Sequence, residues 1–270
     1  MDLITIGVIQ LTSKLDPQLN LASIKEIFYS HPMHSSVEFL FLPECFYSLS
    51  DGLSPTPYVV KNSSQDPHLN SICELSRMLN VSLVGGSVAF LENNNIYNRA
   101  LFIHPSRGFI GQYDKNHLFK VNLENSQLDE SRIYAKGKNS YCTNLKENSS
   151  FKVGFGICFD LRFPDLFRNY FALGCNILSI CAAFTPTTGK AHWEILLRAR
   201  AIENQSFVIA SAQVGEHNSR ISTYGHSMII DPWGRIIDQI PQGNKMMVHT
   251  LDYSTIKEVK ATMNVSNNSH

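Results

Sequence analysis

The sequence predicts an α/β fold whose sheets are largely buried. Segments with the hydrophobic pattern of strands alternate with helical segments, and the second half of the chain repeats the pattern of the first. The run VEFLFL at 37–42 is almost entirely apolar, which is typical of a strand buried on both faces. This alternation over two similar halves favours an α/β sandwich.

In the first half, the pattern predicts a strand, an amphipathic helix, a second strand, a second helix and then three further strands. In chain order these elements are 3–11, 19–29, 37–42, about 68–80, 81–91, 96–104 and 109–115. The second half predicts strands at 151–157, 176–183, 206–213, 225–231 and 245–251, and helices at 164–173 and 190–204. Pro164 is favourable at the first position of a helix, and Glu194 and Arg198 lie one helical turn apart, where they can pair.

Length and composition favour one globular domain that covers residues 1–270. The polar stretches are no longer than loops, and no linker or repeat divides the chain. With 23 basic and 23 acidic residues the net charge is zero, so we expect neither nucleic acid nor a membrane surface as a partner. No apolar run approaches the roughly 20 residues that span a bilayer. The N-terminal MDLITIGVIQLTSK alternates like a strand and has no cleavage site, so we expect a cytoplasmic protein.

The six cysteines form no CxxC pair and no regular framework. We therefore expect all of them to be reduced thiols, as is usual in a cytosolic protein. No cysteine or histidine pair has the spacing of zinc ligands, so we expect no metal and no other cofactor. The cysteines are Cys45, Cys73, Cys142, Cys158, Cys175 and Cys181.

Three chemically reactive side chains follow predicted strands. Glu44 comes after strand 37–42, Lys115 ends strand 109–115, and Cys158 follows strand 151–157 in the segment FGICFDLRFPDLFR. Reactive groups of α/β proteins gather at the carboxyl ends of strands. A thiol nucleophile needs a base to remove its proton and a cation to hold the resulting oxyanion, so the three together favour a cysteine hydrolase.

The segments LPECF, YDKNHLF, GFGICFDLRFPDLFR and FTPTTGKAHWEILLRARAIENQ resemble, in order and spacing, the nitrilase superfamily of carbon–nitrogen hydrolases. The resemblance runs from about Ile4 to Asp252. It implies a four-layer α-β-β-α sandwich. It also implies a homodimer or higher homo-oligomer, for which helices 164–173 and 190–204 are our candidate interface.

The resemblance implies that Glu44 is the general base, Lys115 the transition-state stabiliser and Cys158 the nucleophile. The segment LDESRIYAKG (128–137) resembles the family segment with a second glutamate, which favours Glu130 over Glu124. We expect the thiol, whose ordinary pKa is about 8.5, to lose its proton to Glu44 as it attacks an amide carbonyl. Lys115 and the backbone N–H of Phe159 would hold the oxyanion, a thioester would form, and water would hydrolyse it.

The segments AFTPTTGKAHWE, RARAIENQSFVIASAQVGEHN and STYGHSMIIDPWG resemble most the family branch that hydrolyses deaminated glutathione to 2-oxoglutarate and cysteinylglycine. The alternatives are an ω-amidase acting on α-ketoglutaramate or another small ω-amide, a nitrilase, and a non-catalytic interaction protein. We expect Phe159, Arg162 and Phe184 to contact the small-molecule amide. Arg162 would bind the distal carboxylate, unless it forms an ion pair with Asp160 or Asp165.

Other candidates have structural interpretations. In an extended backbone, Cys45 would point away from the face that Glu44 occupies, and we expect it to serve in packing. His117 and His192 are less favoured alternatives as the general base, and His226 is expected in a polar wall. Asp114, where relatives usually have a basic residue, would pair with a neighbouring cation or face solvent.

Overall fold

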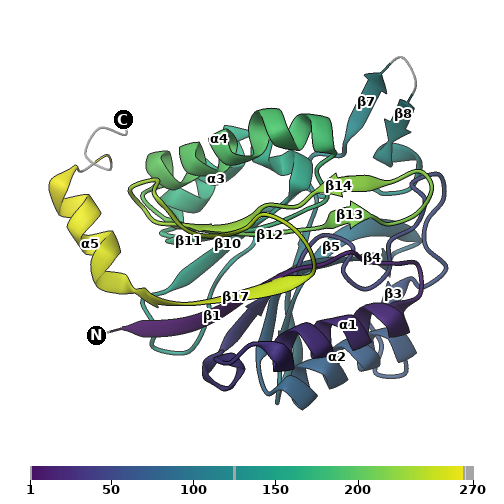
Figure 1. Ribbon diagram of the computed structural model, residues 1–270, viewed down its shortest axis with the longest axis horizontal. Helices are drawn as coiled ribbons and strands as arrows, with labels where there is room; N and C mark the ends of the chain where they lie inside the picture. The colour runs from purple at the N-terminus through teal and green to yellow at the C-terminus, as the bar shows by residue number, and fades with distance from the viewer. Residues whose placement is uncertain (1, 124–125, 264, 266–270) are drawn as a thin grey trace.

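In the computed structural model, which describes residues 2–123, 126–263 and 265, two sheets pack face to face between two layers of helices (Figure 1). Helices α1 (Pro17–Ser30) and α2 (Pro67–Leu79) cover the outer face of one sheet. Helices α3 (Pro164–Ala172) and α4 (Pro186–Asn204) cover the outer face of the other. The predicted four-layer α-β-β-α sandwich is therefore confirmed.

The first sheet is built by the N-terminal half and closed by a strand from the end of the chain. Its order is β17-β1-β2-β4-β5-β6, and β3 pairs with β4 outside this path. β1, β2 and β4 are parallel, whereas β17, β5 and β6 join antiparallel. The bounds are β1 Leu3–Gln10, β2 Phe39–Phe41, β3 Val60–Lys61, β4 Ser82–Glu92, β5 Asn95–His104, β6 Gly108–Asp114 and β17 Lys245–Asp252.

The second sheet has the order β16-β15-β12-β11-β10-β9, with β10, β11 and β12 parallel. Its strands are β9 Cys142–Asn144, β10 Lys152–Ile157, β11 Ile177–Ala182, β12 Phe207–Ala212, β15 Ser227–Ile230 and β16 Ile236–Ile240. Two hairpins stand apart, β7 Lys120–Leu123 with β8 Ser126–Asp129, and β13 Val214–Glu216 with β14 Ser222–Tyr224. Three short 3-10 helices, η1 His34–Ser36, η2 Glu130–Arg132 and η3 Cys158–Arg162, and the helix α5 Tyr253–Thr262 complete the described elements.

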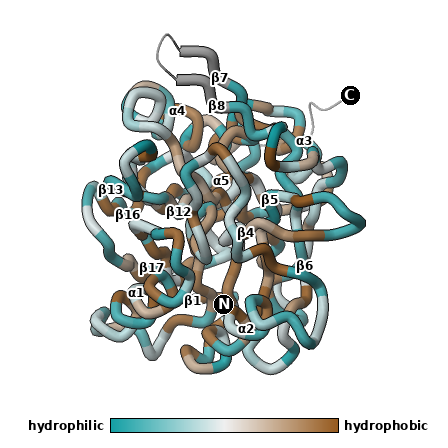
Figure 2. The backbone as a smooth tube through the Cα atoms, turned by 90° about the vertical axis from the view of Figure 1, so that its right-hand side faces the viewer, coloured by the Kyte–Doolittle hydropathy of each residue, from teal (hydrophilic) through white to brown (hydrophobic). Residues whose placement is uncertain are grey.

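Both faces of the central strands are buried, as the run 37–42 predicts. In β2, Phe39 and Phe41 point into the apolar cluster between the sheets, and Leu40 points into a second cluster beneath α1 and α2. The same inner cluster extends to Trp193 and Leu197 of α4. Figure 2 shows the apolar segments running through the interior and the polar ones in the outer loops. Since side chains alternate along a strand, a strand packed on both faces must be apolar throughout.

Helices α1, α2 and α4 begin earlier than the hydrophobic pattern predicts, because proline and a capping side chain fix their first turns. Asp16 accepts a hydrogen bond from the N–H of Gln18, and Asp66 from that of Leu69. Thr185 does the same for Thr188, and proline follows each of these three caps. Such residues satisfy N–H groups that the first turn leaves free. Apolar periodicity carries no information on these polar first turns.

The C-terminal helix α5 and the strand β16 are not predicted by the sequence pattern. In α5 only Ile256 and Val259 are buried, so its apolar stripe is too short to stand out from loop sequence. The side chain of Asp252 accepts a hydrogen bond from the N–H of Ser254 and starts this helix. Figure 1 shows α5 projecting from the end of the strand pair β1 and β17.

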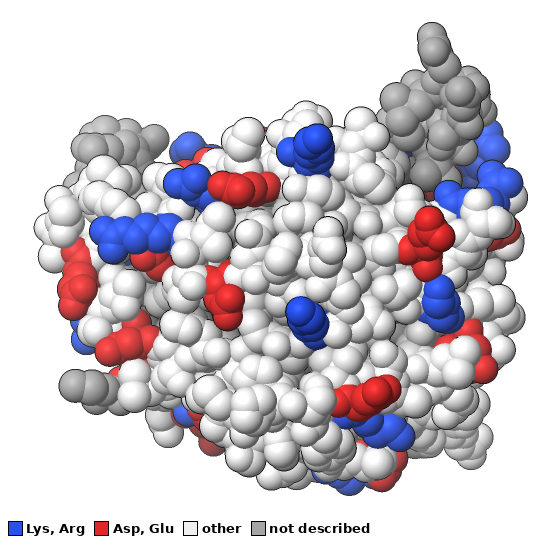
Figure 3. All heavy atoms as spheres, viewed as in Figure 1, with Lys and Arg blue, Asp and Glu red and all other residues white. Residues whose placement is uncertain are grey.

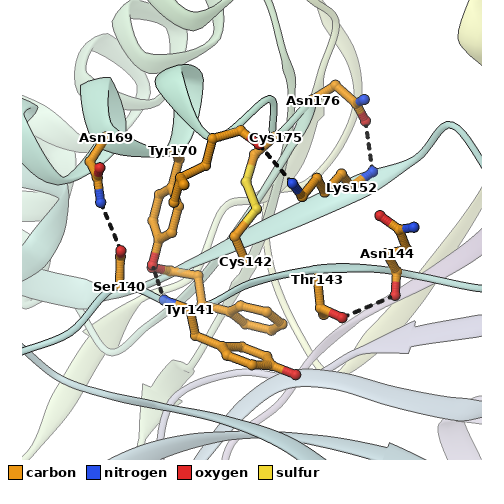
Figure 4. The surroundings of a disulfide bond; sticks show 12 residues. Ser140, Tyr141, Cys142, Thr143, Asn144, Lys152, Asn169, Tyr170, Cys175 and Asn176 are labelled. Atoms are coloured by element: carbon orange, nitrogen blue, oxygen red, sulfur yellow. Dashed lines mark hydrogen bonds between the residues drawn. A yellow bond between two sulfur atoms is a disulfide. The ribbon is translucent and has the colours of Figure 1, made fainter.

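Cys142 of β9 and Cys175 before β11 form a disulfide (Figure 4). The prediction that all six cysteines are reduced thiols is therefore wrong for this pair. The two residues are 33 positions apart and share no motif, and strand pairing brings them together. Cys142 pairs with Gly154 of β10, and Asn176, next to Cys175, donates its N–H to Lys152 at the start of β10. The other four cysteines are free.

Charged side chains of both signs are interspersed on the face shown in Figure 3, and neither sign forms a large field there. Across the described ranges, none of the helices combines the length and the apolar character that crossing a bilayer requires.

Asp114 pairs with a buried cation and does not simply face solvent, which was the other possibility that the sequence left open. The guanidinium of Arg99, fully buried on β5, donates to both oxygens of Asp114, with Nε–Oδ1 2.5 Å and Nη2–Oδ2 2.8 Å. It also donates to Glu92 at 2.8 Å and Gln112 at 3.0 Å. Burial opposes the charge, but these carboxylates outweigh it and raise the pKa of Arg99. The pairing fixes the end of β6, which Lys115 follows directly.

We predict that Arg99→Met destabilises the fold by about 3 kcal/mol, because it leaves two carboxylates beside an apolar side chain. Urea unfolding of the purified variant measures this change. The control is Arg107→Met, since Arg107 reaches Glu147 only at 4.0 Å and both side chains are more than half exposed. That substitution should change the free energy of unfolding by about 0.5 kcal/mol or less. Equal losses in the two variants would contradict the role of the Arg99 cluster.

Candidate active site

Three strand ends bring the predicted residues to one place between the two sheets. Glu44 follows β2 and Lys115 follows β6, so both extend from the first sheet, whereas Cys158 follows β10 of the second. Glu44 and Cys158 line the same pocket, and Lys115 lies beneath it with 1% of its surface exposed. The sequence prediction that these strand ends converge agrees with this geometry.

The ammonium of Lys115 lies between two carboxylates. Its Nζ is 2.9 Å from Oε1 of Glu44 and 2.9 Å from Oε1 of Glu130. Burial on its own lowers the pKa of a lysine, but the two carboxylates raise the pKa of Lys115 well above its ordinary value. Lys115 therefore stays protonated. Burial raises the pKa of Glu130, and the neighbouring Lys115 opposes this shift.

Glu44 is held through its backbone and through one of its two carboxylate oxygens. Oε1 accepts from Lys115 and, at 2.8 Å, from Nδ2 of Asn98. The carbonyl oxygen of Glu44 accepts from Nε2 of Gln213 at 2.8 Å, and the same nitrogen donates to Ser13. Oε2 has no hydrogen-bond donor within the part of the chain that the structure describes. A carboxylate with one free oxygen facing a pocket is able to accept a proton there.

Glu130 begins η2 and is the glutamate that the resemblance favours. Its Oε2 accepts from the backbone N–H of Phe119 at 2.7 Å, while Oε1 accepts from Lys115. The chain then returns beside β6, where Gly137 donates its N–H to the carbonyl of Lys115. A Cβ on Gly137 would lie 2.2 Å from the carbonyl oxygen of Asp114, so only glycine fits. Glu124, the alternative, lies outside the described residues.

Cys158 occupies a left-handed backbone conformation, with φ of 49°, where β10 ends and η3 begins. This conformation is uncommon for a residue with a Cβ and has to be held by its surroundings. Asp160, fully buried, holds it: Oδ2 accepts from the N–H of Ile157 at 3.0 Å and from the hydroxyl of Tyr113 at 2.8 Å. His117 binds Oδ1 of Asp160 through its N–H and its ring.

His117 therefore supports the turn and does not act on the pocket. Its Nδ1 is 2.7 Å from Asp160, its ring stacks on Phe163 at 3.7 Å, and it is absent from the pocket lining. His226 stacks on Tyr224 at 3.9 Å, and its carbonyl accepts from the indole of Trp193. His192 lies beside Arg162, with 3.2 Å between Nδ1 and Nη1. This geometry favours none of the three histidines as the general base.

Burial raises the pKa of Cys158 well above its ordinary value, and the negative charge of Glu44 raises it further, although Lys115 opposes both. The thiol is therefore protonated at neutral pH. A nucleophile in this state needs a base that takes the proton during attack, and the pocket offers a carboxylate for that purpose.

The pocket has a volume of about 260 Å³. Glu44, Glu130, Cys158, Phe159, Arg162 and Phe184, all named from the sequence, are among its lining residues. The other lining residues are Cys45, Leu49, Ser50, Gly52, Phe119, Asp129, Ile133, Tyr134, Ala183, Thr185, Pro186, Thr188, Arg220, Ile221 and Ser222.

Two of these residues depart from the sequence analysis. Cys45 was expected to point away from the site, but its φ is 53°, so the backbone is not extended there and the side chain lines the pocket. Burial, reinforced by the charge of Glu44, raises the pKa of this second thiol. Arg220, between β13 and β14, was not identified. In the sequence, Arg220 is a basic residue among small polar residues, and this composition is ordinary for a loop.

Arg162 forms no ion pair with Asp160 or Asp165 among the described residues, so that alternative interpretation is wrong. Both carboxylate oxygens of Asp160 already accept hydrogen bonds, which come from Ile157, Tyr113 and His117. The guanidinium of Arg162 instead lies 5.7 Å from the ring centre of Phe159 and 5.4 Å from that of Phe184, within cation–π range. A guanidinium held by two rings at a pocket wall is able to bind a carboxylate.

No group of three or more histidine, cysteine or acidic residues within the described ranges has an arrangement that would hold a metal ion. The chemistry that the pocket supports is nucleophilic attack by a thiol, aided by a carboxylate and an ammonium.

Comparison with known proteins agrees with this geometry. The carbon-nitrogen hydrolase family model matches residues 5–261. The chain is 35% identical over 272 residues to a protein named deaminated glutathione amidase from Dictyostelium discoideum, covering 97% of this chain and 92% of the relative. It is 32% identical over 265 residues to the protein of that name from Yersinia enterocolitica, covering 96% and 91%.

The crystal structure of Nit3 from Saccharomyces cerevisiae, described as a member of branch 10 of the nitrilase superfamily, is similar in fold. It matches with a TM-score of 0.85 and 27% identity over 98% of this chain and 96% of Nit3. The resemblance seen in the sequence motifs is thereby confirmed. The chain belongs to the carbon–nitrogen hydrolase family of the nitrilase superfamily, and it is an amidase.

Proposed function

We propose that this amidase hydrolyses deaminated glutathione to 2-oxoglutarate and cysteinylglycine through a thioester on Cys158. The observation that carries the proposal is the arrangement of Glu44, Lys115 and Glu130 beside a protonated thiol in one pocket. The substrate is supported by the names of the relatives and by two arginines in the pocket wall.

In the first half of the reaction, the sulfur of Cys158 attacks the amide carbonyl while Oε2 of Glu44 takes the thiol proton. The ammonium of Lys115 and the N–H of Phe159 stabilise the oxyanion that forms. Phe159 stands at the start of η3, where N–H groups have no acceptor within the helix. When the C–N bond breaks, the leaving amine takes the proton from Glu44, and the acyl group remains on sulfur.

In the second half, water attacks the thioester and Glu44 accepts a proton from it. The C–S bond then breaks, the proton returns to the sulfur, and the acid leaves. Glu130 acts on this cycle through Lys115, because it shares the ammonium with Glu44 and is itself fixed by Phe119. No further group is needed to balance the protons.

The two pocket arginines match the two carboxylates of deaminated glutathione. Arg162 follows the nucleophile closely and would bind the carboxylate of the 2-oxo acyl group. Arg220 is an exposed residue of the β13–β14 hairpin that lines the pocket, and would bind the glycine carboxylate of the leaving group. α-Ketoglutaramate has the same acyl group but releases only ammonia, so its leaving group has no carboxylate for Arg220 to bind.

We also propose a homo-oligomer that acts in the cytoplasm. Ile195 and Ile202 of α4 are 71% and 42% exposed, and Leu173 after α3 is 44% exposed. Apolar side chains exposed on the predicted interface helices support association of two copies through α3 and α4.

Cys158→Ala should abolish turnover and leave the fold intact, because it removes the nucleophile and little packing. Iodoacetamide should alkylate Cys158 faster than the other free cysteines in the wild type. The thiol is protonated at neutral pH because its pKa is raised, and Glu44 can take its proton as the reagent reacts. Cys73→Ala, on α2, is the control and should keep full activity. Turnover by Cys158→Ala at a tenth of the wild-type rate, or faster alkylation of another free cysteine, would rule out this mechanism.

Glu44→Gln and Lys115→Met should each lower kcat by several powers of ten, on the scale of about 3–4 kcal/mol that such groups contribute. Glutamine cannot accept the thiol proton, and methionine cannot stabilise the oxyanion. Circular dichroism and thermal unfolding establish that each variant is folded, and single-turnover kinetics measure acylation. Near-normal rates in either folded variant would refute the assigned roles.

The substrate prediction is a higher kcat/KM for deaminated glutathione than for α-ketoglutaramate. Arg162→Ala should lower both values, whereas Arg220→Ala should lower only the first, by about tenfold for one charge-assisted hydrogen bond of about 1.5 kcal/mol. Arg107→Ala, an exposed change between β5 and β6, is the control for net charge. The reverse substrate preference would identify an ω-amidase, and equal effects of Arg220→Ala on both substrates would contradict its role.

A further inference from the structure

Asn98 connects the two charged residues that the proposed mechanism uses. It lies on β5 with 1% of its surface exposed. Its side-chain Nδ2 is 2.8 Å from Oε1 of Glu44, and its backbone carbonyl accepts the N–H of Lys115 at 2.9 Å. One residue thus fixes the carboxylate of the first and the backbone of the second.

The amide of Asn98 is oriented for Glu44 alone. An ionised carboxylate only accepts hydrogen bonds, so the NH₂ of Asn98, and not its oxygen, must face Glu44. In this orientation Oδ1 of Asn98 is buried without a hydrogen-bond partner among the described residues. Leaving a buried acceptor unsatisfied is unfavourable, and the structure retains it at this position.

We propose that Asn98 is a positioning residue that gives the two oxygens of Glu44 different roles. With Lys115 it saturates Oε1, which keeps Oε2 free to receive the proton of Cys158. The inference rests on the proposed function, because it takes Glu44 as the base.

Lys115 alone would not fix this assignment. Its ammonium can rotate, and it is shared with Glu130, so it would follow the carboxylate of Glu44 if that group turned. Asn98 is a planar donor on a strand, β5, that pairs with a neighbour on each side. The two donors on Oε1 of Glu44 fix the plane of its carboxylate, so Oε2 can point in only one direction.

Substitutions of Asn98 should therefore change how the rates of turnover and alkylation depend on pH. The titratable groups around Glu44 are Lys115, Glu130, Tyr134, Cys45, Cys158 and Cys181. Asn98→Asp adds a carboxyl group directly on Oε1 of Glu44. Aspartic acid donates a hydrogen bond when protonated and repels Glu44 when ionised, so it replaces Asn98 only at low pH. Asn98→Leu has no donor at any pH.

The test measures two rates in both variants between pH 5.5 and 8.5: kcat/KM for deaminated glutathione, and alkylation of Cys158 by iodoacetamide. We expect Asn98→Leu to lower alkylation at least about thirtyfold at pH 7.5. We expect the ratio of the Asn98→Asp rate to the Asn98→Leu rate to fall at least about tenfold from pH 5.5 to 8.5. The control is Asn176→Leu, which removes a buried amide that binds Ser150 and Lys152 and should leave both rates unchanged.

A pH-independent ratio, or an Asn98→Leu rate within threefold of the wild type, would overturn the proposal. If Asn98→Leu does not fold, the ratio of Asn98→Asp to wild type decides, and it must fall with rising pH in the same way. Alkylation of Glu44→Gln separates the two levels of inference. If that variant alkylates as fast as the wild type, Glu44 is not the base and the proposed function fails. A slow Glu44→Gln with unaffected Asn98 variants refutes only the role of Asn98.

Discussion

The position of Lys115 between Glu44 and Glu130 is the interaction on which the rest of the site depends. A buried ammonium is stable only with carboxylates close by, and two buried carboxylates are stable only with the ammonium between them. The cluster therefore fixes the distance between the ends of β2 and β6 and the place of η2. Beside this cluster, burial raises the pKa of Cys158 and the charge of Glu44 raises it further, so the thiol is protonated.

The strand ends around the pocket are supported by neighbours that do not touch a substrate. Arg99 holds Asp114 directly before Lys115, and Asp160 holds the turn directly after Cys158. Both are fully buried charged residues that bind several partners, and each stiffens a turn where the backbone leaves a sheet. The left-handed conformation of Cys158 persists because the turn around it is fixed by Asp160. Reactive groups on such turns keep their positions when loops of the pocket wall move.

The sequence predicted the architecture well because burial on both faces leaves a clear mark, as in the apolar run that became β2. It also predicted which side chains would converge, since strand ends of an α/β fold share an edge. It failed where the outcome depends on backbone dihedral angles or on distant pairing. Cys45 was assigned to the wrong face because its positive φ has no signature in a non-glycine residue. The disulfide of Cys142 and Cys175 depends on the pairing of β9 with β10, and Arg220 depends on where a hairpin folds back.

The site is divided between the two sheets, so its residues come together only when these sheets pack during folding. Glu44 and Lys115 belong to the first sheet and are 71 residues apart, while Cys158 comes from the second sheet. Contacts between such distant segments require the closure of long loops, which slows their formation. Until the two sheets pack together, the thiol lacks its proposed base, Glu44, and the ammonium of Lys115. Under the proposed mechanism, activity therefore requires the packing of the two sheets, and a partly folded chain carries an ordinary cysteine.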